Sequence, residues 1–166
     1  MNVNKVLESG LVERYHSNPN VPNQTNAEHQ WKVVVLLKHF YPNQKTHVYL
    51  AAATHDAAEL VTGDSPSPAK RMQPALKILL DAMEDEIESE WGIKYNLSKE
   101  EKAKIKICDV LEGMHYCHKQ IMQGNKLALE PFSKWAQYYL ALPTYEKNEL
   151  TNNFAETLEG EVLDQF

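Results

Sequence analysis

The segment from residue 46 to residue 63, THVYLAAATHDAAELVTG, constrains the fold more than any other part of the chain. Its middle is almost free of charge until His55, so a helix formed here would lie near the centre of the domain. Gly63 is a typical C-terminal stop for such a helix. Ionisable groups next to a core are costly unless hydrogen bonds or a metal ion compensate them. Four such groups crowd behind the alanines: His55, Asp56, Glu59 and Asp64.

The other segments with regular apolar spacing are also helical in pattern. Residues 16–26 are rich in Asn and Pro and indicate a loop, after which Thr25 or Asn26 can cap the next helix. No stretch alternates as a strand does. The sequence therefore predicts one all-α domain over residues 1–166, a helical bundle of about six or seven helices. The expected helices are 3–15 (weakened by Gly10), 27–41, 46–63, 69–92 (with Pro74 near its start or as a kink), 97–124 (opened by a Ser98–Glu101 capping box) and 132–142, followed by an acidic tail that is amphipathic at best.

The composition limits the classes of partner and the cellular location expected for this chain. The net charge of −6 gives no general attraction to DNA or to an anionic membrane, so neither is expected as a partner. The N-terminus has no apolar signal core and no apolar run reaches membrane-spanning length, which predicts a cytoplasmic location. Cys108 and Cys117 have a spacing that suits neither a zinc knuckle nor a disulfide framework, so both are expected to be buried free thiols.

A metal centre is the main chemical hypothesis. Adjacent helical residues project about 100° apart, so His55 and Asp56 reach one ion only if it lies beside the helix. Imidazole nitrogen with carboxylate oxygen suits Mn, Fe, Co, Ni or Zn. Further ligands must come from elsewhere, and His29 and Asp109 are the best candidates, the latter because it is a carboxylate on an apolar helical face. Each residue alone has an ordinary explanation as a hydrogen-bonded or solvated group, but the joint pattern favours metal.

The pattern H…HD…D resembles the signature of the HD-domain metal-dependent phosphohydrolases. The segments AEH (27–29) and HDAAELVTGDSPSPAK (55–70) resemble the subgroup of bacterial 5′-deoxynucleotidases and small phage dATP triphosphohydrolases, over about residues 10–125. The resemblance implies a first metal shell of His29, His55, Asp56 and Asp109. It implies a divalent transition metal (Co, Mn, Zn, Ni or Fe), with Mg²⁺ as a further ion on the phosphates, and a homo-oligomer, dimeric or hexameric.

The same resemblance assigns the remaining acids to proton transfer. Glu59 lies four residues after His55 on the predicted helix, and it matches the catalytic acid of the family. Asp64 matches the second catalytic carboxylate of the subgroup. Together they would activate water and protonate the departing 5′-oxygen. The ordinary alternatives are a helix-surface glutamate and a turn aspartate.

Phosphate binding needs cations. Lys70 matches the lysine of the subgroup, and Arg71 and Lys77 follow it closely. Arg14 and Tyr15 resemble the Arg-aromatic pair of the family, normally Arg-Trp, which contacts the substrate. Arg14 could grip phosphate while Tyr15 packs on the sugar. The alternatives are surface charge and a core aromatic.

The leading hypothesis is a divalent-metal-dependent hydrolase of 2′-deoxynucleotides, narrowly favoured as a dATP triphosphohydrolase that releases deoxyadenosine and triphosphate. The short chain and the spare cations support that version, and a 5′-deoxynucleotidase acting on dNMPs is the alternative. A cyclic-dinucleotide or ppGpp hydrolase fits the TGDSPSPAK segment poorly. A non-catalytic nucleotide-binding module would have no need of Glu59 and Asp64.

Two other groups have simpler interpretations. His115 and His118, with Cys117 between them, are expected to be solvated helix residues and not a second metal site. Trp135, Tyr138 and Tyr139 are expected in the core or at a subunit contact, not as a base-stacking platform.

Overall fold

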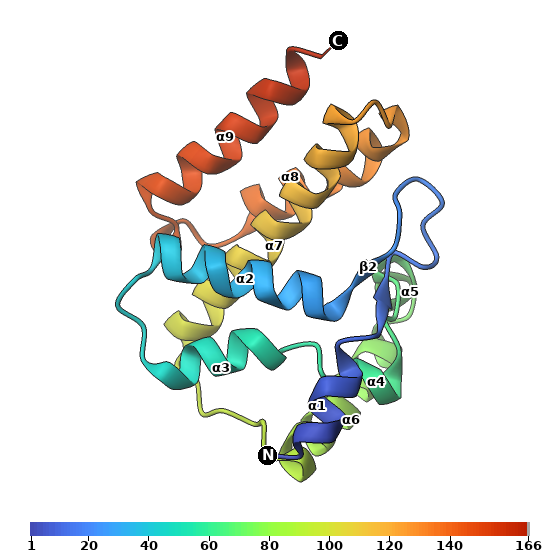
Figure 1. Cartoon of the computed structure of the whole chain (residues 1–166), viewed down its shortest axis with the longest axis vertical. Coiled ribbons are helices and arrows are strands. Elements are labelled where there is room, and N and C mark those ends of the chain that lie inside the picture. The colour runs from blue at the N-terminus through green and yellow to red at the C-terminus, as the bar shows by residue number, and fades with distance from the viewer. Residues whose placement is uncertain (166) are drawn as a thin grey trace.

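The fold is a bundle of helices arranged around α7, the long helix Lys99–Met122 (Figure 1). We describe it from a computed structural model, which describes residues 1–165. The all-α architecture predicted from the sequence is confirmed. Because helices pack against α7 on several sides, much of its surface is buried. The helices that contact it are α2 (Asn26–Phe40), α3 (Thr46–Thr54), α8 (Leu129–Ala141) and α9 (Glu149–Leu163).

Side-chain caps fix where these helices begin. The Ser98–Glu101 capping box is present: the Glu101 amide donates to Ser98 Oγ at 3.1 Å, and the Ser98 amide donates to Glu101 Oε2 at 2.8 Å. Of the two expected caps for α2, Thr25 is the one used, because its hydroxyl accepts from the Glu28 amide. Helix α2 therefore begins at Asn26, and His29 lies near its N-terminal end.

The predicted helix 46–63 is interrupted, which corrects the sequence analysis. Helix α3 ends at Thr54, and α4 covers only Glu59–Thr62. Between them the amides of Ala57 and Glu59 bond to carbonyls three residues back, a tighter pattern than that of an α-helix. The break places His55 and Asp56 directly after the last residue of α3, at the start of a tight turn.

The N-terminal segment also differs from expectation. Helix α1 is short, Val3–Ser9, and the chain then forms β1, Glu13–Arg14. This strand pairs in antiparallel register with β2, Gln24–Thr25, although no strand was expected. The pairing closes the loop between the strands and holds Arg14 beside the start of α2.

Helix α5 (Ser67–Met72) ends before Pro74, which opens α6 (Pro74–Trp91). Helix α6 packs on α4 and α5 at the end of the molecule that holds the N-terminus, away from α9 (Figure 1). Its outer side exposes Ile78 (70%) and Leu79 (60%).

The tail beyond Pro143 is more ordered than expected: it holds α9, and Asn148 caps that helix. Two 3₁₀ turns complete the chain, η1 (Lys126–Ala128) and η2 (Thr144–Glu146).

Cys108 and Cys117 are buried free thiols on α7, as predicted. Within residues 1–165, no helix has the length and apolar character needed to cross a membrane.

Candidate metal and active site

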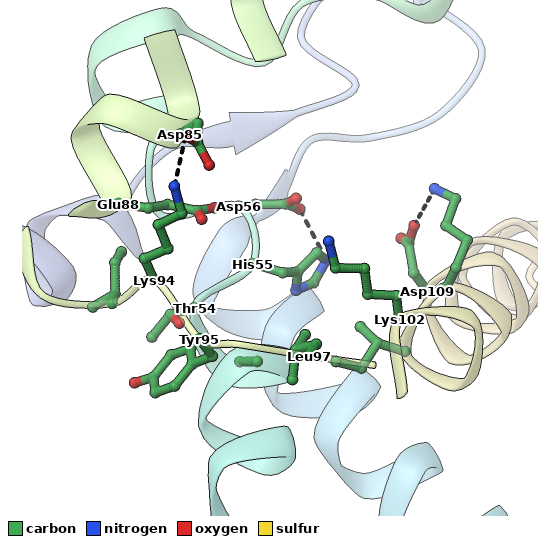
Figure 2. A pocket seen from close by; sticks show the side chains of 14 residues that line it. Thr54, His55, Asp56, Asp85, Glu88, Lys94, Tyr95, Leu97, Lys102 and Asp109 are labelled. Carbon is green, nitrogen blue, oxygen red and sulfur yellow. Dashed lines mark hydrogen bonds and ion pairs between the residues drawn. The ribbon is translucent and has the colours of Figure 1, made fainter. Parts of the chain in front are cut away.

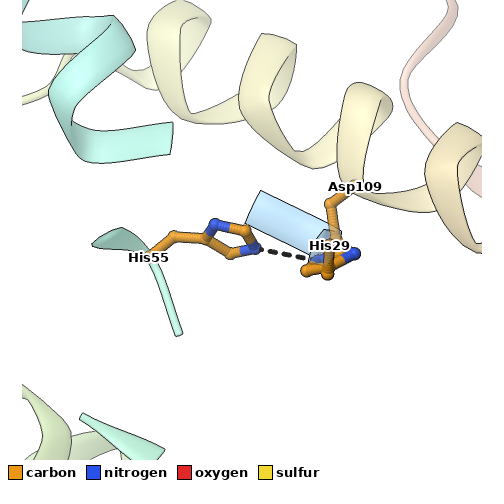
Figure 3. A group of neighbouring side chains, drawn as sticks. All are labelled: His29, His55 and Asp109. Atoms are coloured by element: carbon orange, nitrogen blue, oxygen red, sulfur yellow. Dashed lines mark hydrogen bonds and ion pairs between the residues drawn. The ribbon is translucent and has the colours of Figure 1, made fainter. Parts of the chain in front are cut away.

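Two histidines form the centre of the site, His29 from α2 and His55 from the end of α3 (Figure 3). The Nδ1 atom of His29 lies 2.6 Å from Glu112 Oε2, and that of His55 lies 2.8 Å from the Ala52 carbonyl oxygen. These acceptors assign the ring protons to Nδ1 and leave both Nε2 atoms as electron-pair donors. The two Nε2 atoms lie only 3.3 Å apart. Two facing lone pairs at this distance require a proton or a metal cation between them.

The two carboxylates predicted as ligands join the histidines. Asp109 Oδ1 lies 3.2 Å from His29 Nε2. Asp56 Oδ2 lies 3.6 Å from His29 Nε2 and 3.4 Å from His55 Nε2. Ligand atoms of His29, His55 and Asp109 all lie within 4.8 Å of one another. Two imidazole nitrogens and two carboxylate oxygens are a donor set that fits a divalent transition metal.

The charges of this cluster are strongly coupled. Burial and Arg14 oppose a proton on His29, but Asp109 and Glu112 outweigh them and raise its pKa to about 9. Burial opposes ionisation of Asp109, yet Lys106 and His29 hold the pKa of this carboxyl well below its usual range. A site that attracts a proton so strongly also favours a metal ion, which takes the place of that proton.

Glu112 is a residue of the candidate site that the sequence analysis missed. It is fully buried on α7, and it accepts hydrogen bonds from His29 Nδ1 and, at 2.7 Å, from Gln24 Nε2. A carboxylate behind a ligating histidine fixes the ring orientation and raises its basicity. The available signal was Glu112 itself: a second acid three residues after Asp109 on the same apolar helix.

Arg14 reaches the cluster from β1. Its Nη1 donates to Asp56 Oδ2, and its Nη2 lies 4.0 Å from Asp109 Oδ1. Burial disfavours the guanidinium charge, but Asp56 and Asp109 hold the pKa of Arg14 above its usual value. A cation in this position is suited to a phosphate at the same centre.

Glu59 opens α4 next to the cluster. Asn26 Nδ2 donates to Glu59 Oε2 at 3.0 Å and to the Asp56 carbonyl at 3.2 Å, a link that the sequence analysis missed. Burial and the charge of Asp56 raise the pKa of Glu59 to about 8. A carboxyl with a raised pKa keeps its proton closer to neutral pH than an ordinary glutamate does. Asp64 follows on the loop after α4, with its Oδ2 3.8 Å from His16 Nδ1.

Of Lys70, Arg71 and Lys77, the three cations expected after the acidic cluster, only Arg71 lines one of the two cavities described below. Arg14, also expected to bind phosphate, lines the same cavity as Arg71. Lys70 lies near Glu84 of α6 and lines neither cavity. Lys77 pairs with Asp81 on an exposed side of α6 and also lines neither. Arg71 donates to the Tyr138 hydroxyl. The structure therefore does not bring Lys77 to the site, because its side chain lies on an exposed part of α6 and pairs with Asp81.

Two cavities adjoin the cluster. The first, of about 390 Å³, is called here the aromatic cavity. Its lining includes Arg14, Tyr15, Asp64, Arg71, Trp135 and Tyr138. The second, of about 380 Å³, is called the lysine cavity and is lined by His55, Asp56 and Asp109 together with Lys94, Lys102 and Lys106, lysines that the sequence analysis did not single out. Two acids of α6, Asp85 and Glu88, also line it, and Lys94 Nζ lies 2.6 Å from Asp85 Oδ2. Figure 2 shows Lys94 and Lys102 around the second cavity.

The predictions for His118 and for the three aromatic residues of α8 had different outcomes. His118 is buried, with its Nε2 atom 2.8 Å from Glu161 Oε2, so the expectation that it is solvated was wrong. Packing of α9 on α7 covers it. Tyr139 lies in the core as expected, whereas Trp135 and Tyr138 line the aromatic cavity.

The fold and the H…HD…D cluster define a metal-dependent phosphohydrolase of the HD-domain class, as the sequence analysis predicted. The chain belongs to the YfbR-like 5′-deoxynucleotidase family, whose model matches residues 5–158.

Individual relatives agree with this assignment. A 5′-deoxynucleotidase of Yersinia pestis (strain Pestoides F) is 26% identical over 69% of this chain and 71% of its own length. Among solved structures, the HD phosphohydrolase DatZ of cyanophage S-2L, bound to dA and one catalytic Zn²⁺ ion, has a TM-score of 0.68 at 20% identity. The PH0347 protein of Pyrococcus horikoshii OT3 has a TM-score of 0.67 at 15% identity. These two alignments cover 99% of this chain and 98% of each structure, and they show a common fold.

Proposed function

We propose that this protein is a 5′-deoxynucleotidase that hydrolyses 2′-deoxynucleoside 5′-monophosphates to a deoxynucleoside and phosphate. The observation that carries the proposal is the arrangement of Glu59 and Arg14 around the histidine–aspartate cluster, next to a cavity with aromatic walls. The names of the curated relatives support the monophosphate over dATP, which the sequence analysis favoured. Two of the three cations that supported dATP, Lys70 and Lys77, line neither cavity.

His29, His55, Asp56 and Asp109 would hold a divalent metal ion. When bound there, the ion supplies Lewis-acid chemistry at the phosphorus. Arg14 binds a phosphate oxygen, and the substrate anion releases it from its contact with Asp56.

The two remaining acids divide the proton transfers. Water attacks the phosphorus, the bond from phosphorus to the 5′-oxygen breaks, and Glu59 gives its proton to that oxygen. Asp64 takes the proton from the attacking water. Asn26 orients Glu59 through the hydrogen bond to its carboxyl.

The test is product identification with purified protein. The protein is incubated with Co²⁺ or Mn²⁺ and each dNMP or dNTP separately, and phosphate, pyrophosphate and triphosphate are resolved by ion chromatography. The proposal expects phosphate and deoxynucleoside from dNMPs. A protein that binds nucleotide and releases no product from any of them would be a non-catalytic binding module.

A second candidate, a dNTP triphosphohydrolase, is favoured by one observation. The lysine cavity opens onto His55, Asp56 and Asp109, so a phosphate chain attached at the metal centre could extend toward Lys102, while Lys94 is paired with Asp85. In that case dATP yields intact triphosphate, and Lys102→Ala weakens turnover of dATP more than that of dAMP. Equal effects on both substrates would remove this candidate.

We also propose a homo-oligomer, dimeric or hexameric, as the family resemblance implies. The exposed apolar side chains on the outer side of α6 support it, because large apolar patches usually mark contact surfaces. Light scattering on the purified protein measures the mass directly, and a monomer at micromolar concentration would contradict the proposal.

A further inference from the structure

We propose that Trp135 on α8 is a positioning residue: it fixes Tyr15 at the sugar end of the aromatic cavity and so sets the preference for deoxyribonucleotides over ribonucleotides. The inference rests on the proposed function, because it concerns the substrate of the same site. It gives a role to a residue that the sequence analysis expected only in the core or at a subunit contact.

The backbone at Tyr15 is the first observation. Its φ angle is 61°, in the left-handed region, and among the described residues Tyr15 is the sole non-glycine with a positive φ. A residue with a side chain disfavours this region, so contacts elsewhere must hold Tyr15 there. Such conformations are concentrated at functional sites.

Those contacts come from two helices. The Trp135 indole Nε1 donates to the Tyr15 hydroxyl at 3.0 Å. The Tyr15 ring stacks on the Tyr116 ring, with centroids 5.3 Å apart and planes 13° apart. Tyr116 is itself anchored, because its hydroxyl donates to the Pro22 carbonyl at 3.0 Å. The Tyr15 ring is therefore held at its face by α7 and at its hydroxyl by α8.

Trp135 is in turn held by the backbone of α7. A Cβ atom added at Gly113 would lie 2.5 Å from Trp135 Cε2, closer than any side chain tolerates. The indole therefore lies directly against the helix, in space that only a glycine leaves open. Packing against Gly113 fixes the position of the Trp135 indole. The hydrogen bond from this indole then fixes the Tyr15 hydroxyl.

The place of Tyr15 in the site suggests what it contacts. Its neighbour Arg14 donates to Asp56 and so marks the phosphate end of the substrate. Trp135 and Tyr138 line the same cavity with aromatic surface suited to a base. The sugar lies between phosphate and base in any nucleotide, and therefore beside Tyr15. A ring fixed at both face and hydroxyl cannot move aside for an additional 2′-hydroxyl.

The experiment compares dAMP with AMP in the metal-loaded enzyme. The ratio of the two kcat/KM values is measured for the wild type, Trp135→Phe, Tyr15→Phe and the double variant. Both single variants keep an aromatic ring and remove the same hydrogen bond, so each should lower the ratio about fivefold to tenfold. The double variant should lower it no further, because the bond can be lost only once. Trp31→Phe, at an exposed tryptophan on α2, is the matched control and should leave the ratio unchanged.

An unchanged ratio in folded Trp135→Phe and Tyr15→Phe would overturn the role of Trp135. Effects that multiply in the double variant would also overturn it, because they would show two independent actions. Dissociation constants for deoxyadenosine and adenosine, measured by calorimetry, make the same comparison without turnover. A wild type that hydrolyses neither nucleotide but binds both would therefore refute the proposed function while still testing Trp135.

Discussion

Helices α7 and α6 are both long and amphipathic, yet they have opposite environments. Thirteen residues of α7 are buried, whereas α6 buries only Leu80 and Trp91. Helix α7 lies among α2, α3, α8 and α9, while α6 packs mainly on the short helices α4 and α5. The difference decides what a charged residue does. Asp109 and Glu112 on α7 are desolvated and must find partners, whereas Asp81 and Asp85 on α6 are exposed and their ion pairs with Lys77 and Lys94 are worth little.

The first test of this contrast uses one aspartate from each helix. Asp109→Ala on α7 should remove bound metal and lower turnover by about a thousandfold or more, because a ligand and the charge stabilisation at the phosphorus are lost. Asp81→Ala on α6 should leave both unchanged, since Asp81 is exposed and pairs with the exposed Lys77. Metal content by mass spectrometry and steady-state rates give the two readouts. Stoichiometric metal in Asp109→Ala would contradict the assignment.

A variant of Glu59, the first residue of α4, tests proton transfer separately from metal binding. Glu59→Gln should retain metal and lower kcat by about 10² to 10⁴-fold, the range expected for loss of a general acid. The amide keeps the size of the side chain and can still contact Asn26. Near-normal turnover with metal in place would remove Glu59 from the mechanism.

Stability should follow the same contrast between helices. Leu111→Ala on α7 should lower the free energy of unfolding by about 2 to 5 kcal/mol, because it leaves a cavity in the core. Leu79→Ala on α6 should change it by less than about 0.5 kcal/mol, since that side chain is 60% exposed. Urea titrations of both variants measure the difference. If α6 is a contact between subunits, Leu79→Ala should instead show a stability that depends on protein concentration.

A smaller effect on metal binding than that of Asp109→Ala is expected for the carboxylate behind His29. Glu112→Gln should weaken metal affinity about tenfold to a hundredfold, because the ring loses an ionised acceptor. Glu86→Gln on the exposed side of α6 is the control. An unchanged metal affinity in Glu112→Gln would mean that Glu112 serves packing alone.

The helices with clear caps and apolar spacing were predictable from local sequence, as Ser98 with Glu101 illustrates. The break after Thr54 was not, because nothing in the segment 55–58 is a helix breaker. The burial of His118 was also unpredictable, since it depends on α9 packing over a distant turn of α7.

For the candidate site, spacing and residue type were enough to nominate His29, His55, Asp56 and Asp109, because two carboxylates near apolar segments need a cation. Lys70 was nominated by its match to the subgroup and Lys77 by its closeness to the acidic cluster in the sequence, and neither side chain lines the two cavities.

The sequence by itself determined the helical class, the caps and the residues able to bind a metal, because these depend on local propensity and on side-chain chemistry. Only the tertiary structure decided that Glu112 bonds to His29, that Lys102 lines a cavity together with His55 and Asp56, and that Trp135 donates to Tyr15. These contacts join residues that are distant in the chain, and packing of whole helices fixes them.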